Sequence, residues 1–154
     1  MTEPSDWHRR IAIAFAQVRR PDRAALVRGQ SLEAAQIRNY LAPRTWQQLD
    51  HVALSNYDSR ADLSALPAFL SDDGFRYYLP ALLGFILSDF DKAGLLVDSV
   101  IAALGRSRPL DYPATQRELI RAFLSQLLAD HADDERMCAK LGKAVRIWSE
   151  ESMT

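Results

Sequence analysis

The sequence predicts an all-α protein, folded as a single compact orthogonal or bundle-like domain of six to eight helices. Three observations predict it. Apolar residues recur at helical spacing along most of the chain, helix-capping and helix-stopping residues separate these stretches, and no segment alternates as strands do. With 154 residues, 48% of them hydrophobic, the chain can form a core over about residues 6–149 without a disulfide or a metal.

The first predicted helix covers residues 6–19, with Ser5 as its N-cap and Pro21 as its stop. A connection that can hold one helical turn follows, and Ser31 then caps a helix over residues 32–41. The apolar stripe of the first helix consists of Trp7, Ile11, Phe15 and Val18, and the inward positions of the second are Leu32, Ile37, Tyr40 and Leu41.

Two weaker helical stretches come next. Residues 45–52 predict a short helix with Trp46, Leu49 and either Val52 or Ala53 inward, and residues 55–59 predict a loop by their composition. Residues 61–70 are weakly helical, with apolar side chains at Leu63, Leu66, Phe69 and Leu70.

The middle of the chain contains an aromatic-proline segment, Phe75-Arg76-Tyr77-Tyr78-Leu79-Pro80-Ala81. Ser71 predicts the N-cap of a helix ending near Tyr78. Proline lacks an N–H and disfavours the α conformation of the residue before it, so we expect a break at Leu79 and a new helix from Pro80 to about residue 90. Its inward positions are Leu83, Ile86, Leu87 and Phe90.

The C-terminal third predicts three further helices. The first covers residues 94–104 and is ended by Gly105, and the second is started by Pro113 and runs to about residue 129. The third is opened by Asp133-Asp134-Glu135. The apolar stripes of the last two are Leu119, Ile120, Phe123, Leu124, Leu127 and Leu128, then Met137, Leu141, Ala144, Val145 and Trp148.

Bulk features narrow the classes of function. The single cysteine, Cys138, rules out an intramolecular disulfide, and no apolar run approaches the ~20 residues of a membrane span. The polar first ten residues lack a secretory signal core, so we expect a cytoplasmic protein with no membrane partner.

Metal and nucleophile patterns are weak. His8, His51 and His131 show no paired metal-ligand spacing, and we expect no cofactor. His131 beside Asp130, Asp133 and Asp134, and Asp89 with Asp91, are interpreted as helix-end residues rather than metal ligands. We interpret Cys138 as a buried structural thiol rather than a nucleophile.

Arginines in the N-terminal part offer one possible binding surface. Residues 1–60 carry nine Arg and six acidic residues, net +3, whereas residues 61–154 carry ten basic and fourteen acidic residues, net −4. The arginines could face nucleic acid, but Asp6, Asp22 and Glu33 interrupt them, and a solvated face is the preferred interpretation. The set is Arg9, Arg10, Arg19, Arg20, Arg23 and Arg28.

The aromatic-proline segment offers the other candidate surface, made of Arg76, Tyr77, Tyr78 and Pro80. The preferred interpretation is a structural corner in which Pro80 fixes a kink over packed aromatics. The alternative is a recognition groove at the break, because adjacent helical side chains point about 100° apart and at least one tyrosine would then lie near the surface.

The same segment carries a family resemblance. The chain resembles an uncharacterised family of small bacterial all-helical proteins with a Phe-x-Tyr-Tyr-Leu-Pro-Ala motif, over about residues 11–148. It departs from the family at Pro113, where a small hydroxyl residue is more usual. The supporting positions are Ala14-Phe15, Trp46, Tyr112 with Gln116, and Trp148. The family has no established reaction, so the resemblance implies a fold and a region of interest.

These observations favour a non-enzymatic protein-binding module with a protein partner, and by analogy of class an immunity-type protein that neutralises a toxin. One alternative is a small-molecule sensor or enzyme with a pocket at the Leu79–Pro80 break, lined by Arg76, Tyr77 and Tyr78. A second alternative is nucleic-acid binding through the N-terminal arginines.

Overall fold

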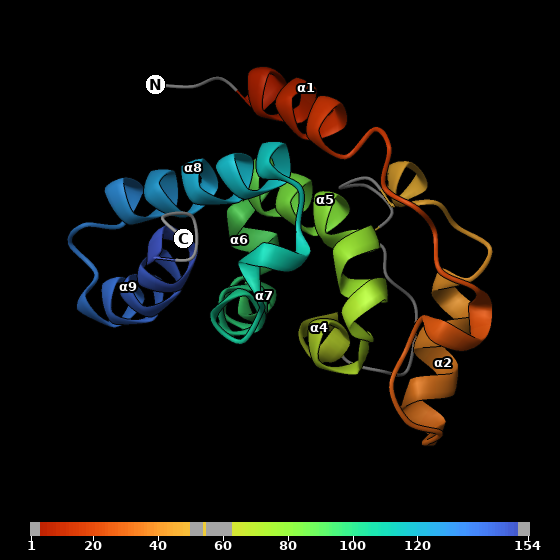
Figure 1. The fold of residues 1–154 in the computed structure, drawn as a ribbon. Coiled ribbons are helices and arrows are strands. Elements are labelled where there is room, and N and C mark those ends of the chain that lie inside the picture. The colour runs from red at the N-terminus through yellow and green to blue at the C-terminus, as the bar shows by residue number, and fades with distance from the viewer. Residues whose placement is uncertain (1–3, 50–53, 55–62, 151–154) are drawn as a thin grey trace. The chain divides into compact units, whose positions relative to one another are not determined.

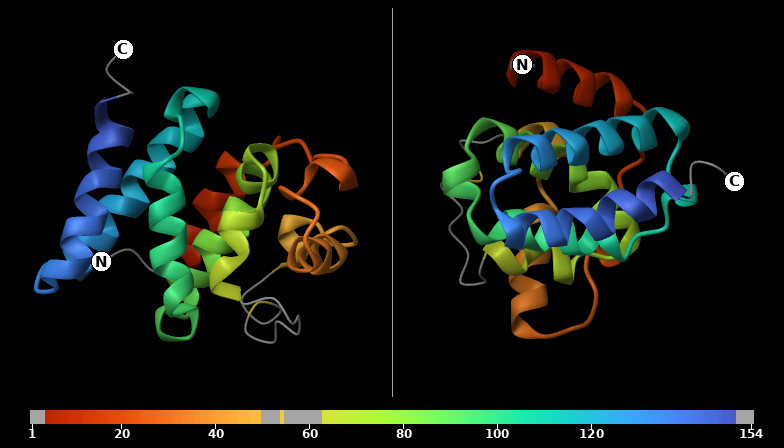
Figure 2. Two further views of the ribbon diagram at one scale, coloured as in Figure 1. Left: turned by 90° about the horizontal axis from the view of Figure 1, so that it is seen from below. Right: turned by 90° about the vertical axis from the view of Figure 1, so that its left-hand side faces the viewer.

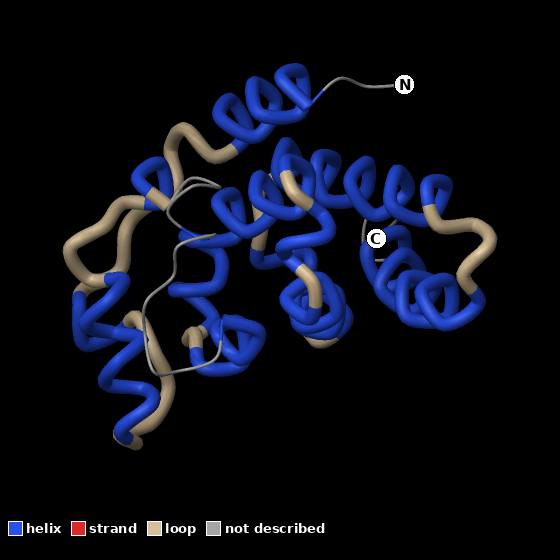
Figure 3. The backbone as a smooth tube through the Cα atoms, turned by 180° about the vertical axis from the view of Figure 1, so that it is seen from behind, coloured by secondary structure: helices blue, strands red, loops and turns tan. Residues whose placement is uncertain are grey.

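The computed structural model describes residues 4–49, 54 and 63–150. Within these residues all regular structure is helical, including eight α-helices, and the backbone contains no strand beyond one isolated bridge between Val27 and Leu70 (Figures 1 and 3). The predicted all-α class is therefore confirmed. None of the helices in this part of the chain has the length and apolar character needed to cross a membrane.

The chain divides into two compact units, Met1–Ser99 and Val100–Thr154, and each is described by itself. The boundary falls inside one helix, α7 (Leu95–Gly105). That the whole chain forms a single domain stays a prediction.

In the first unit, α1 (Pro4–Ala14) packs against α5 (Asp72–Ser88). The stripe Trp7, Ile11 and Phe15 is buried as predicted, whereas Val18 is only partly buried. The helix ends five residues earlier than expected. The backbone N–H of Val18 bonds to the carbonyl of Phe15, a tightened last turn, and the residue before Pro21 is disfavoured from the α conformation.

The connection contains a 3₁₀ turn, η1 (Arg23–Ala25), and α2 (Leu32–Leu41) follows. The Ser31 hydroxyl oxygen accepts a hydrogen bond from the Ala34 N–H at 3.1 Å, which confirms the predicted cap. Leu32 was expected inward but is 74% exposed, because the buried stripe is formed instead by Ala34, Ile37 and Leu41. Tyr40 is half-buried.

A second 3₁₀ turn, η2 (Trp46–Gln48), replaces the described part of the predicted helix over residues 45–52. A capping box between Thr45 and Gln48 begins it, and Leu49 is buried after it. Val52, Ala53 and the predicted loop at residues 55–59 lie outside the described residues. The next stretch is helical, as predicted, in η3 (Leu63–Ala65) and α4 (Leu66–Phe69), with Leu66 and Leu70 buried.

A close contact fixes the start of α5. Ser71 caps the helix as predicted, since its hydroxyl accepts from the Gly74 N–H at 2.9 Å while donating to the Ala25 carbonyl. A Cβ on Gly74 would lie 2.2 Å from the carbonyl oxygen of Leu26. Only glycine lets this turn approach the Leu26 backbone so closely.

The predicted break at Leu79 is wrong. Helix α5 is continuous over Asp72–Ser88, and Pro80 lies inside it. A proline inside a helix costs ~3 kcal/mol. Twelve residues of α5 are buried, from Gly74 to Ile86 with only Arg76 excepted, so burial on all sides of the helix offsets this cost.

The helix that was expected to reach residue 90 instead ends at Ser88, because Asp89 leaves the helical conformation and caps the short α6 (Phe90–Ala93). Leu83 and Ile86 are buried as expected, whereas Leu87 and Phe90 are half-buried. Gly94 follows with φ of 50°, a conformation that favours glycine, and α7 begins directly after it.

In the second unit, a 3₁₀ turn, η4 (Pro109–Asp111), leads to the antiparallel pair α8 (Ala114–Asp130) and α9 (Glu135–Glu150) (Figure 2). Pro113 occupies the N-cap position of α8 without a side-chain cap. Trp148 is fully buried, donates from Nε1 to the Leu104 carbonyl at 2.9 Å, and meets the Tyr112 ring edge-on with centroids 5.1 Å apart.

The apolar stripes of these two helices largely follow the prediction. In α8 only Leu128 of the predicted stripe is half-buried, and in α9 Met137 and Val145 are half-buried. The fully buried members are Leu119, Ile120, Phe123, Leu124 and Leu127 in α8, and Leu141, Ala144 and Trp148 in α9.

Candidate functional site

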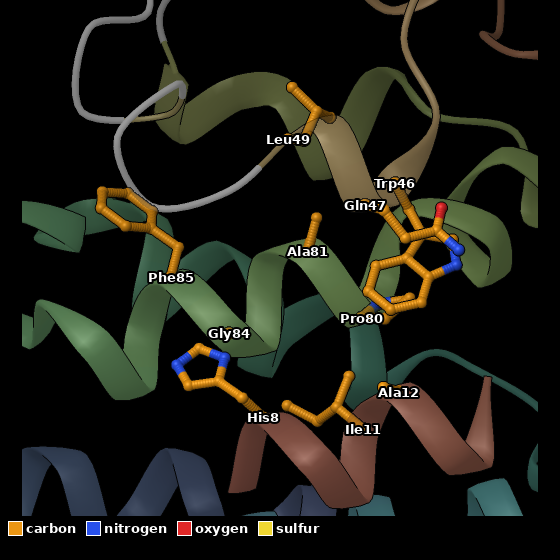
Figure 4. Close-up of a pocket in the computed structure, with 10 residues that line it drawn as sticks. All are labelled: His8, Ile11, Ala12, Trp46, Gln47, Leu49, Pro80, Ala81, Gly84 and Phe85. Atoms are coloured by element: carbon orange, nitrogen blue, oxygen red, sulfur yellow. The ribbon is translucent and has the colours of Figure 1, made fainter. Parts of the chain in front are cut away.

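An apolar cavity of about 430 Å³ opens on the first unit between α1, η2 and α5 (Figure 4). We call it the α1–α5 cavity. Helix α5 lies along one side of it, α1 along another, and η2 with Leu49 faces them. Its size is within the range of small-ligand pockets. The lining residues are His8, Ile11, Ala12, Trp46, Gln47, Leu49, Pro80, Ala81, Gly84 and Phe85.

Polar side chains at the cavity are few. His8, Gln47 and the indole N–H of Trp46 are the polar groups among its lining residues. Trp46 is half-buried, and its ring lies beside Pro80 in Figure 4. Its backbone N–H donates to the buried Tyr77 hydroxyl at 3.3 Å, which ties η2 to α5. A mostly apolar cavity with a partly exposed indole is suited to receiving an apolar group.

Close packing of α1 on α5 shapes the base of the α1–α5 cavity. A Cβ on Gly84 would meet the His8 ring at 3.4 Å, so the absence of a side chain leaves space for the imidazole. At the end of α5 the His8 Nε2 lies 2.7 Å from the Ser88 hydroxyl. This hydrogen bond joins the two helices beside the cavity.

The His8–Ser88 pair raises the question of nucleophilic catalysis, in which a base must activate the hydroxyl and N–H donors must stabilise the oxyanion. Ser88 is the last residue of α5. A helix C-terminus presents carbonyl groups and a partial negative charge, which disfavour an oxyanion. The pair therefore fits a structural link better than a hydrolytic dyad.

The two tyrosines of the predicted surface are buried in the structure. Tyr77 is 4% exposed and Tyr78 is 0% exposed, so both are packed as in the preferred interpretation, and neither lies near the surface as the alternative of a recognition groove requires. The Tyr78 hydroxyl lies 2.9 Å from the Leu41 carbonyl and 2.8 Å from the Arg44 carbonyl, and it closes the C-terminal end of α2. Burial raises the pKa of Tyr78 above 10.0, although the Arg20 guanidinium, hydrogen-bonded to its hydroxyl, opposes this shift.

The structure therefore divides the predicted surface among three environments. Pro80 lines the α1–α5 cavity, Tyr77 and Tyr78 are core residues, and Arg76 lines a separate hollow with Arg19 and Arg20. A pocket at a helix break, lined by both tyrosines, is absent from the described residues because α5 is unbroken there.

Several of the N-terminal arginines contact other groups of their own chain. Arg9 pairs with Asp6, Arg10 lies over the Trp7 ring at 4.4 Å, and Arg23 bonds to Asn39. Arg28 bonds to Asp72 and to the Leu70 carbonyl. Of the predicted set, Arg19 and Arg20 line a common hollow.

The other predicted reactive groups have structural roles. Asp89 caps α6 by accepting from the Lys92 N–H at 3.3 Å, and Asp134 caps α9 by accepting from the Met137 N–H at 3.0 Å. Cys138 is half-buried and its thiol donates to the His131 carbonyl at 3.3 Å. Within the described residues no group of three or more His, Cys, Asp or Glu is placed to hold a metal. His51 lies outside them.

Sequence reasoning missed the participation of His8, Gly84 and Ser88. His8 and Ser88 are 80 residues apart, and no local pattern indicates such a pair. Gly84 stands four residues after Pro80 on the same face of α5, and a glycine inside a buried helix is a signal of close helix approach.

Comparison with known proteins places the chain in a family. Residues 3–152 match the family of unknown function DUF6714, and the chain belongs to it. No curated protein and no solved structure matches the chain. The family assignment agrees with the resemblance to an uncharacterised family and carries no activity with it.

Proposed function

We propose that this member of the DUF6714 family is a non-enzymatic protein-binding module that receives an apolar side chain of its partner in the α1–α5 cavity. The observation that carries the proposal is the cavity itself, open at the surface, mostly apolar, and bordered by the half-buried Trp46. A tryptophan that lines such a pocket is typical of residues that dominate protein-binding energies.

The chemistry beside the cavity supports binding rather than catalysis. The nearest hydroxyl–imidazole pair, Ser88 with His8, lies at a helix C-terminus, where the local dipole opposes an oxyanion. Neutralising a toxin is the specific form of binding that we propose. A basic toxin would be steered to this chain by the acidic residues of 61–154, which carry a net charge of −4.

The test uses a substitution that fills the mouth of the cavity. Ala12 lines the cavity yet is exposed, so Ala12→Trp should block entry without disturbing the core. Ala139→Trp places the same side chain at an exposed position of α9 as a matched control. Affinity capture from the native host should recover one partner with wild type and Ala139→Trp, and lose it with Ala12→Trp.

The recovered partner is then purified and its affinity measured directly. We expect Ala12→Trp to weaken binding at least about tenfold, equivalent to ~1.4 kcal/mol. Equal binding by Ala12→Trp and wild type would overturn the role of the cavity. Loss of growth protection against a neighbouring toxin-like gene after deletion would support the immunity role, and unchanged growth would refute it.

A small apolar molecule is the second candidate ligand, favoured by the cavity volume of about 430 Å³. Nile red, a neutral apolar dye, serves as the probe because it reports entry into apolar sites by fluorescence. Saturable binding that Ala12→Trp abolishes and Ala139→Trp retains would support this candidate. Displacement of the dye by the purified partner would show that the protein ligand occupies the same cavity.

A further inference from the structure

A second hollow, of about 310 Å³, lies on the first unit where the segment after α1 meets the first turns of α5. We propose that this hollow binds an anionic group, a phosphate or a carboxylate, through the guanidinium groups of Arg19, Arg20 and Arg76. We call it the arginine hollow. Its complete lining is Val18, Arg19, Arg20, Pro21, Asp73 and Arg76.

One of the three guanidinium groups is held in place by an ion pair within the hollow. Arg76 forms an ion pair with Asp73, one turn earlier on α5, and its side chain is only 29% exposed. An arginine held by such a partner loses less conformational freedom when it binds a ligand.

The charge of the hollow is unbalanced. The lining contains three arginines and one carboxylate, that of Asp73, so its formal charge is +2. Like charges at close range repel each other, and an anion between them relieves that repulsion. The planar guanidinium group donates two parallel hydrogen bonds to phosphate or carboxylate oxygens, so this anion chemistry fits the lining.

The other N-terminal arginines make the contrast clear. Arg9, Arg10, Arg23 and Arg28 contact other groups of their own chain, and none of them lines the arginine hollow. The gathering at the arginine hollow is therefore specific to these three positions. Helix α5 supplies Arg76, and the segment after α1 supplies Arg19 and Arg20.

The arginine hollow does not depend on the α1–α5 cavity for its test. Arg76 and Pro80 occupy successive turns on one face of α5, about 6 Å apart along the axis, yet they line different spaces. The result of partner capture with Ala12→Trp has no bearing on anion binding. A chain that bound no anion could still receive its partner in the α1–α5 cavity.

The experiment is a titration of the full chain with inorganic phosphate at constant ionic strength, followed by calorimetry and by backbone amide NMR shifts. We expect saturable one-to-one binding, with shifts concentrated at residues 18–21 and 73–76. Arg19→Gln should weaken it at least about tenfold, and Arg9→Gln, an exposed arginine on the same part of the chain, should leave it unchanged.

Further variants and probes separate the possible sources of the anion. Arg76→Gln removes the pair with Asp73, so its melting curve is measured beside its phosphate affinity; Arg19→Gln keeps the test valid if Arg76→Gln unfolds. Stronger binding of succinate than of phosphate would identify a carboxylate ligand. Stronger binding of a short single-stranded DNA, lost in Arg19→Gln, would identify a phosphodiester. The proposal would be overturned if none of the three probes showed saturable binding. It would also be overturned if Arg19→Gln and Arg9→Gln lost the same amount of phosphate affinity.

Discussion

At the scale of single residues, Gly74 is the glycine that leaves the least room for a side chain. A methyl group there would lie 2.2 Å from the Leu26 carbonyl oxygen and 3.1 Å from the Ser71 hydroxyl oxygen that caps the helix. We expect Gly74→Ala to lower the free energy of unfolding by about 3 kcal/mol, because neither backbone segment can yield easily. Urea denaturation measures this change.

Gly142 is the matched control for that substitution. It lies inside α9 with no atom within 4 Å of an added Cβ. Gly142→Ala should therefore raise the free energy of unfolding by about 1 kcal/mol, since alanine favours the helix. Equal effects of the two substitutions would contradict the close contact at Gly74.

Tyr78 links α5 to the end of α2 through its hydroxyl. Tyr78→Phe leaves the Leu41 and Arg44 carbonyls without this donor, and we expect a loss of about 1–3 kcal/mol in the free energy of unfolding. Tyr77→Phe is the comparison, because the Tyr77 hydroxyl accepts a hydrogen bond from the Trp46 N–H at a longer distance of 3.3 Å. A larger loss for Tyr77→Phe than for Tyr78→Phe would contradict this assignment.

The raised pKa of Tyr78 also predicts a pH dependence. Above pH 10.0 the unfolded chain loses the phenolic proton while the folded chain still holds it, so stability from this group is complete below pH 10.0 and decreases as the pH rises. Wild type should lose more stability than Tyr78→Phe between about pH 9 and pH 11. Parallel alkaline slopes in chemical denaturation would show that Tyr78 does not titrate in this way.

At the scale of elements, the continuity of α5 reverses the expected effect of Pro80→Ala on stability. A corner fixed by proline predicts that Pro80→Ala lowers stability by ~1 kcal/mol or more. Inside a continuous helix the substitution restores a backbone donor toward the Arg76 carbonyl and removes a steric conflict worth up to ~3 kcal/mol. We therefore expect Pro80→Ala to keep or raise the melting temperature, and a lower one would favour the corner.

Features of this architecture that local chemistry determines could be predicted from the sequence, and features that depend on distant residues could not. Ser31 and Ser71 were predictable as caps because capping is local chemistry. The exposure of Leu32 and the continuity of α5 could not be predicted, because burial by residues distant in sequence decides both. The α1–α5 cavity could not be predicted either, because its lining residues come from three separate segments of the chain.

At the scale of the whole molecule, α7 connects the two compact units, because residues 95–99 belong to the first and residues 100–105 to the second. Loss of structure in the second unit should therefore unwind a helix that the first unit also uses. We expect one unfolding transition, seen equally by helical circular dichroism and by tryptophan fluorescence.

Trp148→Phe tests this expectation. It removes the hydrogen bond to the Leu104 carbonyl and buried aromatic volume in the second unit, and should cost about 2–3 kcal/mol. The single transition should move to lower temperature as a whole. Two separated transitions in the variant would show that the units unfold independently.

The hydrogen bonds that close the first unit have a consequence for the rate of folding. His8 bonds to Ser88 across 80 positions, Ser71 to Ala25 across 46, and Tyr78 to Leu41 across 37. Helical proteins usually fold fast because their contacts are local, whereas long loops must close before distant contacts can form. We expect this chain to fold more slowly than a helical bundle of its length, with α1 docking onto α5 as a late step.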